Sequence, residues 1–161
     1  MDISTWIDAL SDGDSGRRAD AAERLARVGD EARGAAVPLV RAAGDPDEQV
    51  RQWATAALEE LGPPALEDGP ALALLLTSEQ ADVAYWAATL LGRLADGSFV
   101  GELAAALGKQ RPQSVRERAC WALGRIGPPA REVLPALQAV SQEKQPRLAR
   151  LARSAVDRIG G

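Results

Sequence analysis

Apolar residues recur along the chain in helical segments with a repeat of about 33 residues, a period that is typical of stacked helical hairpins. The clearest copy is VRQWATAALEELG, from Val50 to Gly62. Matching segments begin at nearly constant spacing before and after it, at Arg17, Val83, Val115 and Leu148. Five copies that agree at four or more positions establish an internal repeat.

Within each copy the apolar residues stand at offsets 0, 4, 8 and 11 from the first position, so they share one face of an α-helix. Offset 4 is always alanine, and offsets 8 and 11 are aliphatic. The residues at these three offsets are Ala21, Leu25 and Val28; Ala54, Leu58 and Leu61; Ala87, Leu91 and Leu94; Ala119, Leu123 and Ile126; and Ala152, Val156 and Ile159. We expect them to form the core, with the alanines allowing close approach between helices.

Shorter apolar segments between these copies predict a partner helix for each one. They are AAVPLVRAA, PALALLL, FVGELAAAL and EVLPALQAV, and the N-terminal WIDAL stretch supplies the first partner. Polar turns separate the two helices of a pair, and Asp47 and Ser114 are the expected N-cap residues. Glycine at offset 12 suits a left-handed residue just past a helix end. The glycines at this offset are Gly29, Gly62, Gly127 and Gly160.

The pattern D-x-D-x-x-V-R-x-x-A-x-x-A-L-x-x-L-G, from Asp45 to Gly62, resembles HEAT repeats. It is most similar to the HEAT-like repeats of bacterial bilin-lyase-type proteins, and the resemblance covers nearly the whole chain. It implies an all-α fold, an α-solenoid of about five HEAT-like helical hairpins, within a single domain of residues 1–161. The expected repeats span about 1–29, 30–62, 63–95, 96–127 and 128–161.

The resemblance also implies a ladder, within or between repeats, of an aspartate in the turn and an arginine at offset 1. Asp14 with Arg18 and Asp47 with Arg51 match that pattern, and Arg116 keeps only the arginine. Because Ala84 and Ala149 depart from it, we expect the ladder to be interrupted in the third and fifth repeats.

In such repeats the second helix of each pair lines the concave surface, which the resemblance again implies. Offsets 3, 6 and 10 flank the core face of that helix. The candidate binding residues there are Trp53, Trp86, Thr89, Arg93, Arg118, Trp121, Arg125 and Arg158, with Tyr85 beside them at offset 2. Aromatic side chains framed by arginine are typical of binding hot spots. The alternative is that each tryptophan covers an alanine-rich groove between adjacent helices.

Charge is divided unevenly along the chain. Residues 1–108 hold 8 basic and 19 acidic side chains, whereas residues 109–161 hold 11 and 4. The basic part would suit an acidic partner, an anionic surface or a nucleic acid backbone. Two other interpretations are a solvated outer face on the last helix and head-to-tail association of the acidic and basic ends.

The chain has no histidine, which excludes Ser-His-Asp triads, Cys-His pairs and histidine-ligated metals. Cys120 takes a position where other copies carry mostly small residues, so we expect a packed thiol. We predict no metal and no cofactor. One cysteine and no secretory signal fit a cytoplasmic protein, and the composition is that of a bacterium rich in GC. No apolar window is long enough to span a membrane.

The function that these observations favour is a non-catalytic scaffold or adaptor that binds a protein or peptide, an acidic one among the candidates. The first alternative is a nucleic-acid-binding HEAT-like protein of the DNA glycosylase kind. The second is a tetrapyrrole (bilin) lyase or chaperone subunit, which rests only on the repeat subtype.

Overall fold

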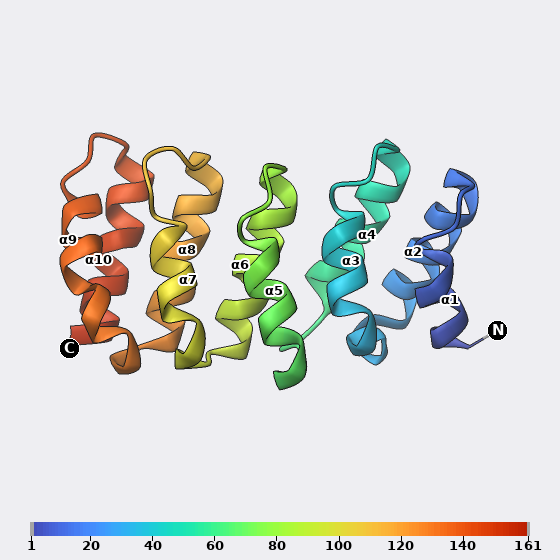
Figure 1. Ribbon diagram of the computed structural model, residues 1–161, viewed down its shortest axis with the longest axis horizontal. Coiled ribbons are helices and arrows are strands. Elements are labelled where there is room, and N and C mark those ends of the chain that lie inside the picture. Colours follow the sequence, from blue (N-terminus) through green and yellow to red (C-terminus); the bar gives the residue numbers. More distant parts are fainter. Residues whose placement is uncertain (1, 161) are drawn as a thin grey trace. The chain divides into compact units, whose positions relative to one another are not determined.

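The computed structural model describes residues 2–160, and throughout this range the chain forms helices and no strand (Figure 1). The α-helices alternate between a shorter first and a longer second member of each pair. They are α1 (Ile3–Ala9), α2 (Ser15–Val28), α3 (Ala36–Ala42), α4 (Glu48–Glu60), α5 (Gly69–Leu75), α6 (Ala81–Leu94), α7 (Val100–Ala105), α8 (Gln113–Ile126), α9 (Leu134–Ser141) and α10 (Pro146–Gly160). Short 3₁₀ turns precede several first helices, at Gly29–Ala35, Leu66–Asp68, Gly97–Phe99 and Pro128–Val133. The predicted all-α fold is confirmed.

The chain divides into two compact units, Met1–Ala71 and Leu72–Gly161, with the division inside α5. In the first unit α2 packs against α1 and α4, and α3 packs against α4. In the second unit α8 packs against α6, α7 and α10, and α9 packs against α10. Second helices therefore stack on second helices within each unit. Met1 and Gly161, the ends of the predicted single domain, lie outside the described residues, and the domain and repeat limits stay a prediction.

The repeat anchors form the core of both units. The five alanines at offset 4 are buried, as are Leu25, Leu58, Leu91 and Leu123 at offset 8. Three predicted core residues are only half-buried, namely Val28, Leu94 and Val156. Val28 and Leu94 are the last residues of α2 and α6, where the chain turns toward the next hairpin. The anchor pattern thus defines most of the core, and two of its three half-buried exceptions lie at helix ends.

Aspartates begin two of the second helices. Asp47 caps α4, accepting hydrogen bonds from the amides of Gln49 and Val50, as predicted. Asp14 caps α2 by accepting from the amide of Arg17. The prediction for Ser114 is wrong, because α8 begins at Gln113 after Pro112, whose fixed φ of −56° suits this boundary. The Pro112 carbonyl accepts from the amides of Val115 and Arg116 instead.

Only two of the four predicted glycine ends take a positive φ. Gly29 and Gly127 have φ values of 61° and 76°. The prediction is wrong for Gly62, because α4 ends at Glu60 and Leu61 is already extended, and for Gly160, which belongs to α10. At the end of α6 the left-handed residue is Ala95, with φ 56° and ψ 36°, and its amide donates to the Leu91 carbonyl. A side chain is therefore held where glycine is preferred.

Among residues 2–160, no helix is both long and apolar enough to span a membrane.

Candidate functional site

The α8 helix presents three of the predicted binding residues on one side. Arg118, Trp121 and Arg125 are spaced three and four residues apart, so they lie along a single strip of the helix. The opposite strip, which includes Ala119 and Leu123, is fully buried. Burial of the alanine and leucine face therefore turns the arginines and the tryptophan outward. Arg118 and Trp121 are half-buried, and Arg125 is exposed.

Arg118 lies between two aromatic rings. Its Cζ is 4.8 Å from the centre of the Tyr85 ring and 4.6 Å from the centre of the Trp121 ring. Its Nη2 donates a hydrogen bond of 2.6 Å to the Tyr85 hydroxyl, while its buried Nε has no hydrogen-bond partner. Contact with two rings holds the guanidinium plane in place. The aromatic rings position the charge, and no carboxylate among residues 2–160 neutralises it.

A glycine on α6 seats the Trp121 ring. A Cβ atom at Gly92 would lie 2.5 Å from Trp121 Cζ3 and 3.0 Å from Ala122 Cα. The two helices can approach this closely only because position 92 has no side chain. A second arginine also lies over the ring, with Arg125 Cζ 5.9 Å from its centre. The packing of α6 on α8 therefore fixes the orientation of Trp121.

Arg158 extends this surface onto α10. A Cβ atom at Gly124 would lie 3.4 Å from Arg158 Cδ and 3.3 Å from Ala155 Cα, so the arginine stem lies beside the α8 backbone. A shallow hollow of about 40 Å³ lies here between the two helices. Its lining residues are Cys120, Trp121, Gly124, Leu151, Ser154, Ala155 and Arg158. We call Tyr85, Arg118, Trp121, Arg125 and Arg158 the arginine–aromatic surface.

Three predicted site residues on α6, namely Trp86, Thr89 and Arg93, are not part of the arginine–aromatic surface. Trp86 is only 7% exposed and Thr89 only 1%, so neither presents a side chain for contact. Trp86 packs edge-on against Tyr85, with ring centres 5.5 Å apart, and Thr89 donates to the Tyr85 carbonyl at 2.8 Å. Arg93 Cζ lies 5.9 Å from the centre of the Trp86 ring. For Trp86 the packing alternative describes what the structure shows.

Trp53, the remaining predicted residue, lies on α4 in the first unit and is half-buried. The second unit holds every other predicted site residue.

Cys120 lies under the arginine–aromatic surface as a packed thiol. Its side chain is fully buried, and this burial raises the pKa of the thiol to about 12. The expectation of a packed thiol is confirmed, and the thiol has no nucleophilic character at neutral pH.

The predicted arginine ladder exists, but its acidic partners are different residues. Arg18 pairs with Asp45 of the following hairpin, at 2.8 Å and 3.0 Å, and Arg116 pairs in the same way with Glu143. The predicted pairs of Arg18 with Asp14 and of Arg51 with Asp47 do not form. Both aspartates accept backbone amides as helix caps instead, which leaves the arginines to reach other acceptors.

The sequence carries a signal for the true partners that the offset pattern missed. Asp45 and Glu143 both stand five residues before the first anchor of their repeats, and Asp12 takes this position in the first repeat. Where offset 1 is Ala84, Arg111 of the next hairpin supplies a guanidinium instead. Its Nη2 donates to the carbonyls of Leu76 and Ser78. The ladder is thus inter-repeat, and an arginine of the next turn replaces the missing one.

The pKa values of the ladder carboxylates follow from these contacts. Hydrogen bonds from Arg116 hold the pKa of Glu143 below its ordinary value, against the opposing effect of partial burial. Burial by itself raises the pKa of Asp45, but hydrogen bonds from Arg18 and the Asp47 amide outweigh it, so the net shift is downward. Both carboxylates are therefore charged at neutral pH.

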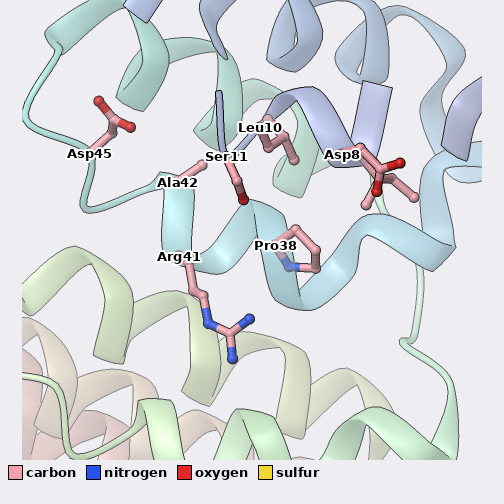
Figure 2. Close-up of a pocket in the computed structure, with 8 residues that line it drawn as sticks. Asp8, Leu10, Ser11, Pro38, Arg41, Ala42 and Asp45 are labelled. Carbon is pink, nitrogen blue, oxygen red and sulfur yellow. The ribbon is translucent and has the colours of Figure 1, made fainter. Parts of the chain in front are cut away.

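The first unit contains a larger hollow, of about 470 Å³, between α1 and α3 (Figure 2). Its lining residues are Ile7, Asp8, Leu10, Ser11, Pro38, Arg41, Ala42 and Asp45. The Asp45 carboxylate is already bound by Arg18, and the Arg41 side chain extends away from Asp45. Because its charged groups do not converge, this hollow offers a ligand less than the arginine–aromatic surface does.

The charge of the chain is divided between the two units. Residues 1–71 hold 7 basic and 15 acidic side chains, a net charge of −8. Residues 72–161 hold 12 basic and 8 acidic side chains, a net charge of +4. The arginine–aromatic surface therefore lies in the unit whose overall charge is positive.

Solved structures with similar folds include armadillo and HEAT-like repeat proteins. The complex of CpcE and CpcF of phycocyanin lyase from Nostoc sp. PCC7120 shares 24% identity with a TM-score of 0.71, over 99% of this chain and 65% of that one. A designed armadillo repeat protein in complex with the peptide (KR)4 shares 18% identity with a TM-score of 0.66, over 98% and 81%. The archaeal HEAT-like repeats protein from Thermococcus onnurineus NA1 shares 16% identity with a TM-score of 0.66, over 98% and 70%.

No curated protein sequence matches the chain. The sequence profile of HEAT repeats matches residues 69–156, which is more than half of the chain. The predicted α-solenoid of HEAT-like hairpins is confirmed by this match and by the similar folds. Its buried anchors, its stacked second helices and this match together show that the chain belongs to the HEAT-repeat family.

Proposed function

We propose that this protein is a non-catalytic scaffold that binds a protein or peptide partner on the arginine–aromatic surface. The observation that carries the proposal is the position of Arg118 between Tyr85 and Trp121, with its charge unpaired. Arginine and large aromatics are the residues enriched at binding hot spots. Here they lie together on the second helices of one unit, partly open to solvent.

Preorganisation supports this role. A free arginine loses rotamer freedom when it binds a partner, which opposes association. Arg118 has already lost that freedom, because two rings and the Tyr85 hydroxyl hold it. Trp121 is likewise seated over Gly92. A partner would therefore meet a surface whose central side chains are already ordered.

Repeat proteins of similar fold lend general support. The designed armadillo repeat protein was solved with a bound peptide, and CpcE was solved in complex with CpcF. The CpcE–CpcF structure belongs to a lyase, so the fold also occurs in an enzyme. Two features of this chain support a non-catalytic role. It has no histidine, and burial raises the pKa of its single thiol to about 12.

Selection of a random peptide library on the immobilised protein tests the proposal. Peptides enriched on the wild-type chain should bind Arg118→Gln and Trp121→Leu at least about tenfold more weakly, a difference of about 1.4 kcal/mol. Leucine keeps an apolar side chain over Gly92, so the helix packing is retained. Arg131→Gln is the matched control, because Arg131 is an exposed arginine of the same unit in the 3₁₀ turn Pro128–Val133. If the selected peptides bind all three variants as tightly as the wild type, the partner does not bind on the arginine–aromatic surface.

Nucleic acid binding is a second candidate, because the second unit has a net charge of +4 and an exposed arginine pair near Trp121. Binding of single-stranded DNA should then weaken steeply with added salt and depend on Arg125 and Arg158. Titration of labelled oligonucleotide at low salt is the direct measurement. The total charge of −4 opposes this candidate.

A further inference from the structure

Three arginines of the arginine–aromatic surface have no acidic partner in the protein. Arg118, Arg125 and Arg158 form no ion pair with any carboxylate among residues 2–160. Other arginines of the chain are paired, including Arg18 with Asp45 and Arg116 with Glu143. Arg118, Arg125 and Arg158 thus lie together on the outward strips of α8 and α10 without a carboxylate partner.

The acidic residues of the same two helices do not neutralise this surface. Glu117 on α8 is bound by Arg147 at 3.4 Å, and its side chain is only 13% exposed. Asp157 on α10 is exposed but occupies offset 9 of its repeat, whereas Arg158 occupies offset 10. Successive helical residues point about 100° apart. The outward strip therefore keeps its positive charge.

The spacing of the three arginines matches a peptide in the polyproline II conformation. Arg125 and Arg158 occupy the same offset on adjacent, packed helices, and such helix axes lie about 8–10 Å apart. Arg118 and Arg125 are separated by two helical turns, a rise of about 10 Å. A chain in the polyproline II conformation advances about 3.1 Å per residue with three residues per turn, so either spacing corresponds to about three residues and every third side chain lies on the same face.

We infer that the arginine–aromatic surface binds an acidic peptide segment in the polyproline II conformation, with Asp or Glu at intervals of three residues. This inference rests on the proposed function and names the class of partner. The carboxylates pair with Arg118, Arg125 and Arg158, because the planar guanidinium presents two parallel N–H groups that match a carboxylate. The Trp121 ring, with both Arg118 and Arg125 over it, supports the apolar residues between them.

A peptide fits these observations better than a polyanion does. Nucleic acid binding draws its strength from many phosphate contacts along a long positive track. Here the arginine–aromatic surface offers only three arginines, and residues 1–71 carry a net charge of −8. Three arginines with an aromatic platform suit a few discrete carboxylates joined by apolar residues.

Fluorescence anisotropy with three labelled peptides of equal length, each spanning four of these intervals, tests the inference. The first carries glutamate at every third position among neutral residues, the second has the same composition with its glutamates adjacent, and the third replaces each glutamate by glutamine. We expect the spaced peptide to bind at least about tenfold more tightly than the glutamine peptide, which is about 1.4 kcal/mol. The isomer with adjacent glutamates should lie between them, and added salt should weaken the spaced peptide most.

Variants of the protein locate the binding. Arg125→Gln and Arg158→Gln change exposed side chains, so their folding is secure, and each should weaken the spaced peptide about tenfold, or about 1.4 kcal/mol. Arg118→Gln should weaken it at least as much, with circular dichroism and thermal melting to confirm the fold. Arg131→Gln, the matched control, should bind the spaced peptide as the wild type does.

The possible outcomes separate the class of partner from the proposed function. Equal binding of the glutamate and glutamine peptides, or an equal loss in Arg131→Gln, overturns the inference. So does tighter binding of single-stranded DNA that depends on the same three arginines. If library peptides bind through Trp121 and Arg118 but are not acidic, the proposed function stands and the inference fails. If neither library nor acidic peptides depend on these residues, both fail.

Discussion

Arg116 on α8 and Glu143 in the loop before α10 form a two-pronged ion pair that ties one helical hairpin to the next. Arg116 is only 5% exposed, and its Nε also donates to the Leu107 carbonyl at 2.8 Å. The Arg116 guanidinium therefore bonds both to the Leu107 carbonyl, just after α7, and to the Glu143 side chain in the loop of the following hairpin. Arg18 does the same in the first unit, with the Asp12 carbonyl and the Asp45 carboxylate.

Replacement of Glu143 by glutamine should destabilise the protein. The change leaves the nearly buried Arg116 without its negative partner, and loss of a hydrogen bond to a charged group costs about 1–3 kcal/mol. Urea unfolding followed by circular dichroism measures the free energy of unfolding. Glu132→Gln is the matched control, because Glu132 is exposed and has no ion pair among residues 2–160, and it should change stability by less than about 0.5 kcal/mol. Equal losses of unfolding free energy in both variants would show that the ion pair of Arg116 with Glu143 stabilises the protein no more than an exposed carboxylate does.

The ion pair of Arg116 with Glu143 predicts that the stability of the protein depends on pH. The pKa of Glu143 is lower in the folded protein than its ordinary value, so the folded state favours the charged carboxylate. Its contribution to stability is complete above the ordinary glutamate pKa of about 4.3 and is lost as the pH falls through the lower folded value. The stability difference between wild type and Glu143→Gln should therefore shrink on acidification below about pH 4. A difference that stays constant from neutral pH down through this range would contradict this.

Substitution of Gly92 by alanine should displace the Trp121 ring. The added Cβ would lie 2.5 Å from Trp121 Cζ3 and 3.0 Å from the Ala122 backbone, so α6 and α8 must separate or the ring must move. Overpacking of this kind costs about 1–3 kcal/mol, and tryptophan fluorescence should change with it. Gly101→Ala is the control of opposite sign. Position 101 lies in α7 with no atom within 4 Å of an added Cβ, so this change should stabilise the protein by about 1 kcal/mol.

Substitution of Ala95 by glycine should stabilise the protein. Ala95 ends α6 in the left-handed region, with φ 56° and ψ 36°, where a Cβ is unfavourable by about 1 kcal/mol. Thermal melting should show a gain of up to about 1 kcal/mol for Ala95→Gly. The opposite control is Ala105→Gly in the last turn of α7, where glycine should cost about 0.5–1 kcal/mol. A loss of stability in Ala95→Gly would mean that the left-handed end is not maintained in solution.

Sequence patterning identified the core of this protein because helical burial leaves a strong local signal. Alanine at offset 4 and a leucine at offset 8 recur in phase with the α-helical turn, and all five of those alanines are buried. The Asp47 cap was predictable for the same reason, since an N-cap acts on amides two and three residues away. The end of α4 was not predictable in this way, because Leu61 is already extended one residue before Gly62.

The candidate site was predictable only in part. Periodicity placed Arg118, Trp121 and Arg125 on one strip of α8, where the structure has them. The same periodicity placed Trp86 on the equivalent strip of α6, where the structure buries it against Tyr85. Equivalent positions in two repeats differ in burial because burial depends on the side chains of the neighbouring helix. The offset of a residue within its own helix carries no information about those side chains.

By itself the sequence determined the repeat, the helical hairpins and the inward face of each helix, because these depend on contacts within about four residues along the chain. Only the tertiary structure decided which arginines are paired and which are not. Arg116 finds Glu143 and Arg18 finds Asp45, each 27 residues along the chain, while Arg118 comes to lie between two rings from different helices. Such contacts depend on how one hairpin stacks on the next, and that stacking is set by small residues such as Gly92 that admit a neighbour's side chain.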